Sequence, residues 1–293
     1  MTRGHVDSDG ARVSVLECGH SGRPLLLVHS INAAASAAEV EPLRVHFQKT
    51  RHVITVDLPG FGESDRSDRR YTPRLMTDAL LDVARWIVAR DGIPLDALAL
   101  SLSCEFLARA AAEAPALFRS VAFVSPTGFN GRRSLRGAPG TTRAMPWLYA
   151  LLTGPGWGAQ LFGLLTRPGV IRYFLERTWG SRNIDPQLLR ADIMMSRYPG
   201  AHHAPLYFLS AALFSADIHT VYESIAVPVW ASHGRRGDFT DYRQLRPMAA
   251  RRSWRVTGFD TGALPYFEDL EAFAAEYEAF MSHCAGAAAG AGS

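Results

Sequence analysis

Short apolar runs alternate with helical patterns along most of the chain, and this alternation limits the possible folds more than any other feature. The apolar runs are rich in Leu or β-branched residues and end at Gly, Pro or Ser, which is typical of buried strands. We therefore expect an α/β fold, a mostly parallel, twisted sheet with helices on both faces. The expected strands are 12–18, 25–29, 53–57, 95–100, 120–125, 227–232 and 254–257, and the expected helices are 36–47, 73–90, 104–114, 242–250 and 267–282.

The alternation stops between residues 129 and 224, where the chain is rich in Trp, Tyr, Phe and Met. This change predicts an inserted helical cap after the sixth strand of the sheet. Such a cap covers the carboxyl ends of the strands, where open α/β sheets bind their ligands. The expected organisation is a core of residues 1–128 and 225–284, a cap of 129–224, and a disordered tail of 285–293 that holds only Ala, Gly and Ser.

Composition and charge argue against several classes of function. The 293 residues are 47% hydrophobic and 20% charged, and the net charge of +3 with scattered basic residues does not suit nucleic acid. No apolar run reaches the roughly 18 residues of a membrane span. Cys18, Cys104 and Cys284 lack the spacing of a metal site or a disulfide framework. We expect a cytoplasmic protein that binds a small-molecule substrate without metal, cofactor, nucleic acid or membrane, and the sequence leaves its oligomeric state open.

Five segments, taken in order along the chain, resemble those of one known enzyme family. Residues 57–64 read Asp-Leu-Pro-Gly-Phe-Gly-Glu-Ser and match the D-x-P-G-x-G-x-S loop of that family closely. Residues 24–30 resemble its oxyanion strand and turn, and residues 100–105 lie where its nucleophile turn belongs. Residues 227–234 resemble the strand that carries the catalytic acid, and 261–268 the segment that carries the histidine base. The resemblance covers nearly the whole chain and implies the α/β-hydrolase fold.

The histidine of the family's catalytic triad is missing. Segment 261–268 is similar to Gly-His-x-Pro-His-x-Glu, but Ala263 stands at the position of the first histidine. A serine hydrolase needs that imidazole to take the proton from its serine and to return it later. Because alanine can do neither, the resemblance implies a degenerate triad.

The nucleophile of this family lies on a sharp strand-to-helix turn, within G-x-S-x-G. Here residues 101–105 read Ser-Leu-Ser-Cys-Glu, with serine and glutamate in place of the two glycines. The resemblance implies that Ser103 presents its hydroxyl to the substrate, and the alternative is that Ser103 is a helix N-cap. Cys104 fits a small buried side chain better than a nucleophile. Glu105 is stabilised by the helix dipole, ties down a neighbouring loop, or acts as an acid or base.

Two backbone N–H groups, those of Ile31 and Cys104, are the oxyanion donors that the resemblance implies. Asn32 adds a side-chain amide donor or serves as a turn residue. Ser30 replaces a glycine that is usual in the family, and His29 is expected to hold the loop by hydrogen bonds.

Asp238 lies one residue beyond the family's position for the catalytic acid. A one-residue shift restores the carboxylate. The alternatives are an ion pair with Arg235 or Arg236, or a helix cap. Tyr266, close to the missing base in sequence, is expected to orient a substrate through its hydroxyl. In the cap, the pair at 202–203 is a further candidate for a replacement imidazole.

Three departures meet in one expected site: no histidine, no glycines in the nucleophile turn, and serine in the oxyanion loop. We therefore expect chemistry without a complete triad, on a small, largely apolar substrate that contains a carbonyl group. Candidates are a cofactor-free lyase or cyclisation reaction, in which N–H donors stabilise a developing enolate or alkoxide, and substrate-assisted cleavage of an ester or thioester. The alternative is a catalytically silent protein that binds an apolar small molecule under its cap.

Overall fold

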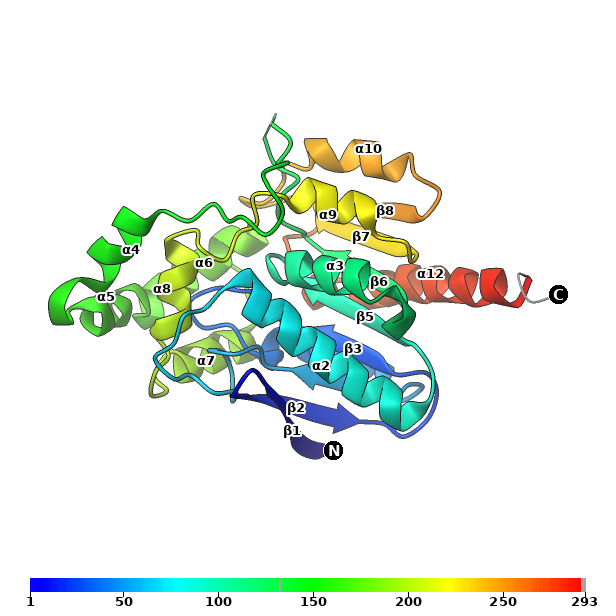
Figure 1. The fold of residues 1–293 in the computed structure, drawn as a ribbon, viewed down its shortest axis with the longest axis horizontal. Helices are drawn as coiled ribbons and strands as arrows, with labels where there is room; N and C mark the ends of the chain where they lie inside the picture. Colours follow the sequence, from blue (N-terminus) through cyan, green and yellow to red (C-terminus); the bar gives the residue numbers. More distant parts are fainter. Residues whose placement is uncertain (132, 291–293) are drawn as a thin grey trace.

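The computed structural model describes residues 1–131 and 133–290, and its named strands form a single twisted sheet (Figure 1). The strands are β1 (Thr2–Ser8), β2 (Ala11–Cys18), β3 (Leu25–Val28), β4 (Val53–Val56), β5 (Leu95–Leu100), β6 (Phe118–Val124), β7 (Val229–Gly234) and β8 (Trp254–Phe259). Their order across the sheet is β1-β2-β4-β3-β5-β6-β7-β8. β1 and β2 pair antiparallel at one edge, and every pair from β4 to β8 is parallel.

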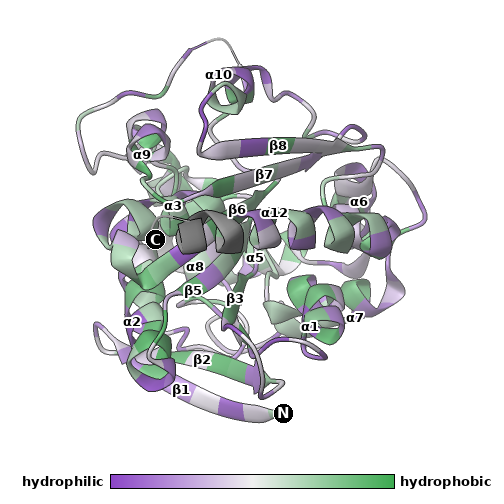
Figure 2. Cartoon of the chain, turned by 90° about the vertical axis from the view of Figure 1, so that its right-hand side faces the viewer, coloured by the Kyte–Doolittle hydropathy of each residue, from purple (hydrophilic) through white to green (hydrophobic). Residues whose placement is uncertain are grey.

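Helices cover both faces of this sheet. Figure 2 shows α2, α3 and α9 on one side, with α1 and α12 on the other. The helices are α1 (Glu41–Phe47), α2 (Pro73–Asp91), α3 (Ser103–Glu113), α4 (Pro146–Thr153), α5 (Gly158–Leu165), α6 (Pro168–Trp179), α7 (Pro186–Met195), α8 (His203–Leu209), α9 (Ile218–Ser224), α10 (Arg246–Ala249), α11 (Pro265–Glu268) and α12 (Leu270–Gly290), with short 3₁₀ turns η1 (Ala37–Val40), η2 (Pro115–Leu117), η3 (Gly154–Gly156) and η4 (Arg243–Leu245). The expected fold class is confirmed.

Burial explains why most strands could be predicted. Every residue of β3, β4 and β5 is buried, because helices pack on both faces of the central strands. Such strands are continuous apolar runs in the sequence. β1 was not predicted: it is a largely polar edge strand, Thr-Arg-Gly-His-Val-Asp-Ser, whose first four residues are exposed or half-buried. Backbone pairing with β2 holds it in place instead of apolar packing.

The segment between β6 and β7 carries the helices α4 to α9. Helices α4 to α8 lie together beyond one end of the sheet (Figure 1), and we call this group of helices the cap. Helix α9, which is inside the predicted cap range 129–224, packs against α3 instead. In the predicted tail 285–293, α12 extends to Gly290, so residues 285–290 are helical, and residues 291–293 lie outside the described part of the chain. Among the described residues, no helix combines the length and the apolar character that a membrane crossing requires.

Candidate active site

Ser101 occupies the sharp turn between β5 and α3. Its φ is +50°, in the left-handed region that residues with a side chain rarely adopt and that costs about 1–3 kcal/mol. The turn is held by three backbone hydrogen bonds: Ser101 N–H donates to Val124 O (2.8 Å), and Ser101 O accepts from Cys104 N–H (3.2 Å) and Thr127 N–H (3.4 Å). Strain at this residue is the property of a nucleophile turn, which presents one hydroxyl at the end of a strand. Ser101 is accordingly half-exposed.

The structure corrects the prediction for Ser103. That residue begins α3, is fully buried, and its Oγ has no hydrogen-bond partner in the described part of the chain. The N-cap of α3 is Leu102, so the alternative role for Ser103 also fails. With the turn centred on Ser101, the two glycine positions of G-x-S-x-G fall on Ala99 and Ser103. Both are small, which the close approach of strand and helix requires.

The expected oxyanion donor from Cys104 is also corrected, because its N–H already donates to Ser101 O. The residue after the turn is Leu102, and its N–H takes the position of the second donor. Among the hydrogen bonds of the described residues, none is donated by Leu102 N–H or by Ile31 N–H. Both N–H groups are therefore available to an oxygen of a ligand, and Leu102 also stands at the positive end of α3. The Cys104 thiol is fully buried, burial raises its pKa well above the ordinary value, and Sγ donates to Ala99 O (3.2 Å), which makes it inert.

Glu39 organises the loop that carries Ile31. Its buried carboxylate accepts from Ser30 N–H (2.6 Å), from Ser30 Oγ (2.9 Å) and from the Asn32 side-chain amide (2.6 Å). Burial raises the pKa of Glu39, and these donors partly offset the effect. The backbone oxygen of Glu39 accepts from the Tyr266 hydroxyl (2.6 Å), and Tyr266 is fully buried. No pattern in the sequence singled out Glu39, because its partners come together only in the fold.

This network changes the roles predicted for three residues. The Asn32 side-chain amide is occupied by Glu39 and Ser30, and its Oδ1 accepts from Ala34 N–H (2.7 Å), so Asn32 shapes the turn and adds no oxyanion donor. The hydroxyls of Ser30 and Tyr266 are likewise engaged in holding the loop rather than free to bind a substrate. The Ser30 hydroxyl, which a glycine would lack, adds one more bond to the buried carboxylate.

His29 holds neighbouring loops, as the resemblance implied. Its Nε2 accepts from Leu58 N–H (2.9 Å), and Nδ1 lies 2.5 Å from Ser30 O. In the matched loop 57–64, the Asp57 carboxylate accepts from Ala37 N–H (2.7 Å) and Glu63 N–H (2.9 Å). A side chain at Gly62 would overlap that carboxylate, since its Cβ would lie 1.9–2.3 Å from the Asp57 carboxyl atoms. The most specific motif of the sequence is therefore structural: it fixes the loops beside the site.

Ala263, at the position of the missing base, packs against the cap helix α6. Ala263 is buried, its N–H donates to Thr178 O (3.0 Å) at the end of α6, and its carbonyl accepts from Ser125 Oγ (2.6 Å). A Cβ on the neighbouring Gly262 would lie 2.5 Å from Trp179 Cα. The end of α6 thus lies directly against the segment that holds the histidine in related enzymes.

Asp238 is directed away from the site. Its carboxylate pairs with Arg177 of the cap helix α6, and both side chains are exposed. Its N–H donates to Arg177 O (3.2 Å). The restored catalytic acid is therefore corrected to an exposed ion pair, and the partner is neither Arg235 nor Arg236. The two candidate replacement imidazoles in the cap have other surroundings. His202 lines a cavity, and His203 Nδ1 lies 3.5 Å from Asp68 Oδ1.

Glu105 ties two loops together, which was one of its three predicted roles. The residue is fully buried, and its carboxylate accepts from Thr127 Oγ1 (2.5 Å) and from Ser215 N–H (2.9 Å). Burial raises the pKa of Glu105 to about 7. Thr127 follows β6 and Ser215 precedes α9, so this carboxylate anchors the returning end of the cap segment to α3.

Asp192 of α7 is a second buried acid that the sequence patterns did not reveal. Its Oδ1 has no hydrogen-bond partner among residues 1–131 and 133–290. Burial raises its pKa well above the ordinary value, and the charge of Glu39 adds to the effect. Because α7 contacts η1, this carboxyl group lies on the cap side of the oxyanion loop. No cluster of three or more His, Cys, Asp or Glu suited to a metal ion occurs in the described chain.

Two cavities lie in the cap. One, of about 490 Å³, lies between α5 and the loop after α7, and the other, of about 400 Å³, lies beside the end of α7. Neither is lined by Ser101, Ile31 or Ala263, so neither is the pocket expected between the cap and the strand ends.

Comparisons with known proteins support the fold assignment. A family model described as the alpha/beta hydrolase fold matches residues 23–163. No curated protein matches the sequence. Among solved structures, a membrane phospholipase A, described as a bacterial virulence factor, is 20% identical with a TM-score of 0.69, over 97% of this chain and 86% of that chain.

Two further structures are similar over almost the whole chain. The meta-cleavage product hydrolase CumD from Pseudomonas fluorescens IP01, as a mutant, is 14% identical over 96% of this chain and 97% of that one, with a TM-score of 0.70. The Cif epoxide hydrolase from Acinetobacter nosocomialis is 18% identical over 95% and 88%, with a TM-score of 0.68. At these identities the likeness establishes the fold, and the chemistry has to be argued from the residues of this chain.

Proposed function

We propose that this chain, whose residues 23–163 match the model of the alpha/beta hydrolase fold, is an enzyme that uses Ser101 and two backbone N–H groups without a histidine base. The substrate is a small, largely apolar molecule with a carbonyl group. The observation that carries this proposal is the strained turn at Ser101, whose positive φ is that of a nucleophile turn. No hydrogen bond of the described residues uses the N–H groups of Ile31 and Leu102, and Ala263 stands at the position of the base.

The backbone donors define what the site can stabilise. A carbonyl oxygen held by Ile31 N–H and Leu102 N–H gains stabilisation when it becomes an enolate or alkoxide, because the donors are fixed before the reaction begins. The dipole of α3 adds to this effect at Leu102. Ser101 then serves as a hydrogen-bond donor that positions the substrate. This arrangement supports a cofactor-free lyase, cyclisation or rearrangement reaction, with the buried carboxyl group of Asp192 as a candidate proton donor on the cap side.

Substrate-assisted cleavage of an ester or thioester is a second mode for the same site. In that mode a basic group of the substrate takes the hydroxyl proton as Ser101 Oγ attacks the carbonyl carbon. The oxyanion collapses, the leaving group departs with that proton, and water releases the acyl group from Ser101. The substrate then does what the missing imidazole does in a complete triad.

Activity assays with matched serine variants test the proposal. Turnover of p-nitrophenyl acetate and labelling by a fluorophosphonate are expected to be slow, because loss of a triad member costs several orders of magnitude. In the lyase or cyclisation mode, Ser101→Ala is expected to lower turnover of the native substrate about twofold to tenfold, as one neutral hydrogen bond of about 0.5–1.5 kcal/mol does. In the cleavage mode the same substitution removes the nucleophile and abolishes turnover. Ser103→Ala is the control and leaves turnover unchanged, since its hydroxyl is buried. Rapid turnover with efficient labelling of Ser101 contradicts the proposal and demands a base supplied by the protein.

The packing at Gly262 and Ala263 favours one alternative. Thr178 and Trp179 lie directly against the slot of the base, which also suits a binding protein that has lost catalysis. A silent protein binds an apolar carbonyl compound and returns it unchanged. Mass spectrometry of a bound compound after incubation separates the two functions, because the enzyme yields a product and the binding protein does not.

A further inference from the structure

The outer part of the cap has an unusual charge pattern. No Asp or Glu occurs between residues 114 and 175, and residues 144–166 contain no charged residue at all. This uncharged stretch forms α4, η3 and α5, and we call residues 144–166 the apolar hairpin. Figure 1 shows α4 and α5 at the extremity of the cap, farthest from the sheet. None of the residues of α4 is buried.

Large apolar side chains of the apolar hairpin are exposed to solvent. Trp147 and Leu151 of α4 are 66% and 54% exposed, and Trp157 and Leu164 are 51% and 50% exposed. The Trp157 indole N–H donates to Leu151 O (2.8 Å), so this ring is held in place and its only polar group is satisfied internally. Several exposed apolar side chains on two successive helices mark an interaction surface, whereas isolated ones do not.

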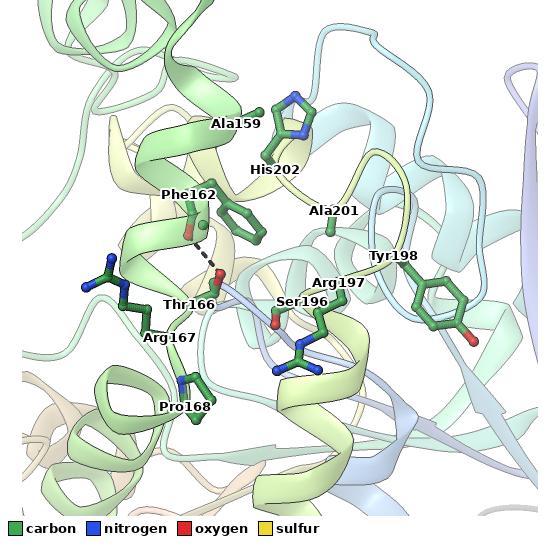
Figure 3. Close-up of a pocket in the computed structure, with 11 residues that line it drawn as sticks. Ala159, Phe162, Thr166, Arg167, Pro168, Ser196, Arg197, Tyr198, Ala201 and His202 are labelled. Atoms are coloured by element: carbon green, nitrogen blue, oxygen red, sulfur yellow. Dashed lines mark hydrogen bonds between the residues drawn. The ribbon is translucent and has the colours of Figure 1, made fainter.

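Exposed arginines border the apolar hairpin. Arg167 follows α5, Arg190 is on α7, and Arg197 follows α7, and no ion pair of the described residues includes any of the three. Arg167 and Arg197 line the same cavity, together with Phe162 and Thr166 (Figure 3). Arg197 also lines the second cavity beside Arg190. Arg167 and Arg197 therefore share a cavity with α5, and Arg190 shares the second cavity with Arg197; we call these three residues the arginine row.

We propose that the apolar hairpin docks on the surface of an anionic lipid bilayer, with the arginine row on lipid phosphates. Short helices that carry Trp and Leu on one side and arginines nearby bind in the plane of the headgroup region, by apolar burial and electrostatic attraction. Tryptophan is the side chain enriched at that depth. Docking of this kind needs no spanning helix, so it is compatible with the lack of one, although it departs from the expectation of no membrane partner.

The charge pattern argues against a second copy of the chain as the occupant. A two-fold contact through this face brings the same patch of both copies together. Arginines would then face arginines, with no acidic residue of the hairpin to pair with them. Exposed arginines beside an apolar patch fit an anionic bilayer better. The proposal is independent of the chemistry at Ser101.

Vesicle sedimentation with the full chain tests the docking. The protein is expected to bind vesicles of phosphatidylcholine and phosphatidylglycerol, and about tenfold more weakly to phosphatidylcholine alone. Binding should weaken as NaCl rises from about 0.1 to 0.5 M, because salt screens the arginines. Trp147→Ala with Trp157→Ala should lower binding about tenfold or more. Phe239→Ala is the matched control, an equally exposed aromatic residue after β7, and should leave binding unchanged.

Charge reversal tests the arginine row separately. Arg167→Glu with Arg197→Glu should abolish the preference for anionic vesicles, whereas Arg252→Glu, at an exposed position before β8, should preserve it. Circular dichroism verifies that each variant is folded. If the tryptophan variant does not fold, quenching of the wild-type fluorescence by bromine-labelled lipids provides the readout. Absence of sedimentation and quenching, an equal loss in the control variants, or a hairpin-dependent dimer that does not bind vesicles would overturn the proposal.

Discussion

Replacement of Glu105 by glutamine should remove a pH dependence of stability that this buried carboxyl imposes. Glu105 is fully buried on α3, and its carboxyl group accepts hydrogen bonds from the Thr127 hydroxyl and from Ser215 N–H. Burial raises its pKa from the ordinary 4.5 to about 7. Between these two values the folded chain holds a proton that the unfolded chain has lost. Stability is therefore greatest below about pH 4.5, falls as pH rises, and levels off above about pH 7.

The size of the effect follows from the two pKa values. They differ by about 2.5, and each unit is worth 1.36 kcal/mol, so the charged carboxylate costs at most about 3 kcal/mol above pH 7. Glutamine is neutral at every pH, and its amide can accept from Ser215 N–H and donate to the Thr127 hydroxyl. We expect Glu105→Gln to match the wild type near pH 4.5 and to exceed its stability by up to about 3 kcal/mol near pH 8.

Urea unfolding followed by tryptophan fluorescence at several pH values measures this difference. Glu113→Gln is the matched control, because Glu113 is the last residue of the same helix and its exposed carboxylate pairs with Arg74. A surface pair contributes about 0–1 kcal/mol, so that variant should show no comparable dependence on pH. Parallel stability curves for the wild type and Glu105→Gln would refute the reasoning and place a stable charge at Glu105 in the folded chain.

The packing around Ala263 and around Gly62 gives two further predictions. Ala263→His is expected to raise esterase activity by less than about a hundredfold, which is the contribution of a positioned base, because Asp238 is paired with Arg177 and cannot orient the new imidazole. A larger gain in hydrolysis of p-nitrophenyl acetate would mean that the histidine is the only residue missing from the site. Gly62→Ala is expected to destabilise the fold by about 1–3 kcal/mol, because φ of Gly62 is +51° and the new Cβ would overlap Asp57. The loss is measured as a lower midpoint of urea unfolding, and an unchanged midpoint would mean that the loop relaxes without cost.

The sequence alone predicts the lack of a base, because segment 261–268 resembles the base segment of α/β-hydrolases and Ala263, at the position of the histidine, has no proton-accepting group. The position of the nucleophile turn was not evident in the same way. Both Ser101 and Ser103 lie between a strand and a helix, and the prediction chose the second. A local signal was present, since centring the turn on Ser101 leaves the small residues Ala99 and Ser103 in both glycine positions. The backbone conformation decided it: φ is positive only at Ser101 within this turn.

The sequence by itself determined where the buried strands lie along the chain, because burial on both faces demands mostly apolar residues in a strand. Tertiary structure decided what the polar residues do. Glu39 meets Ser30 and Asn32 only when η1 folds back on the oxyanion loop, and Asp238 meets Arg177 across 61 residues of chain. Apolar periodicity is a property of neighbours in sequence, whereas the partner of a buried or paired charge is chosen by distance in space, and that distance exists only in the folded chain.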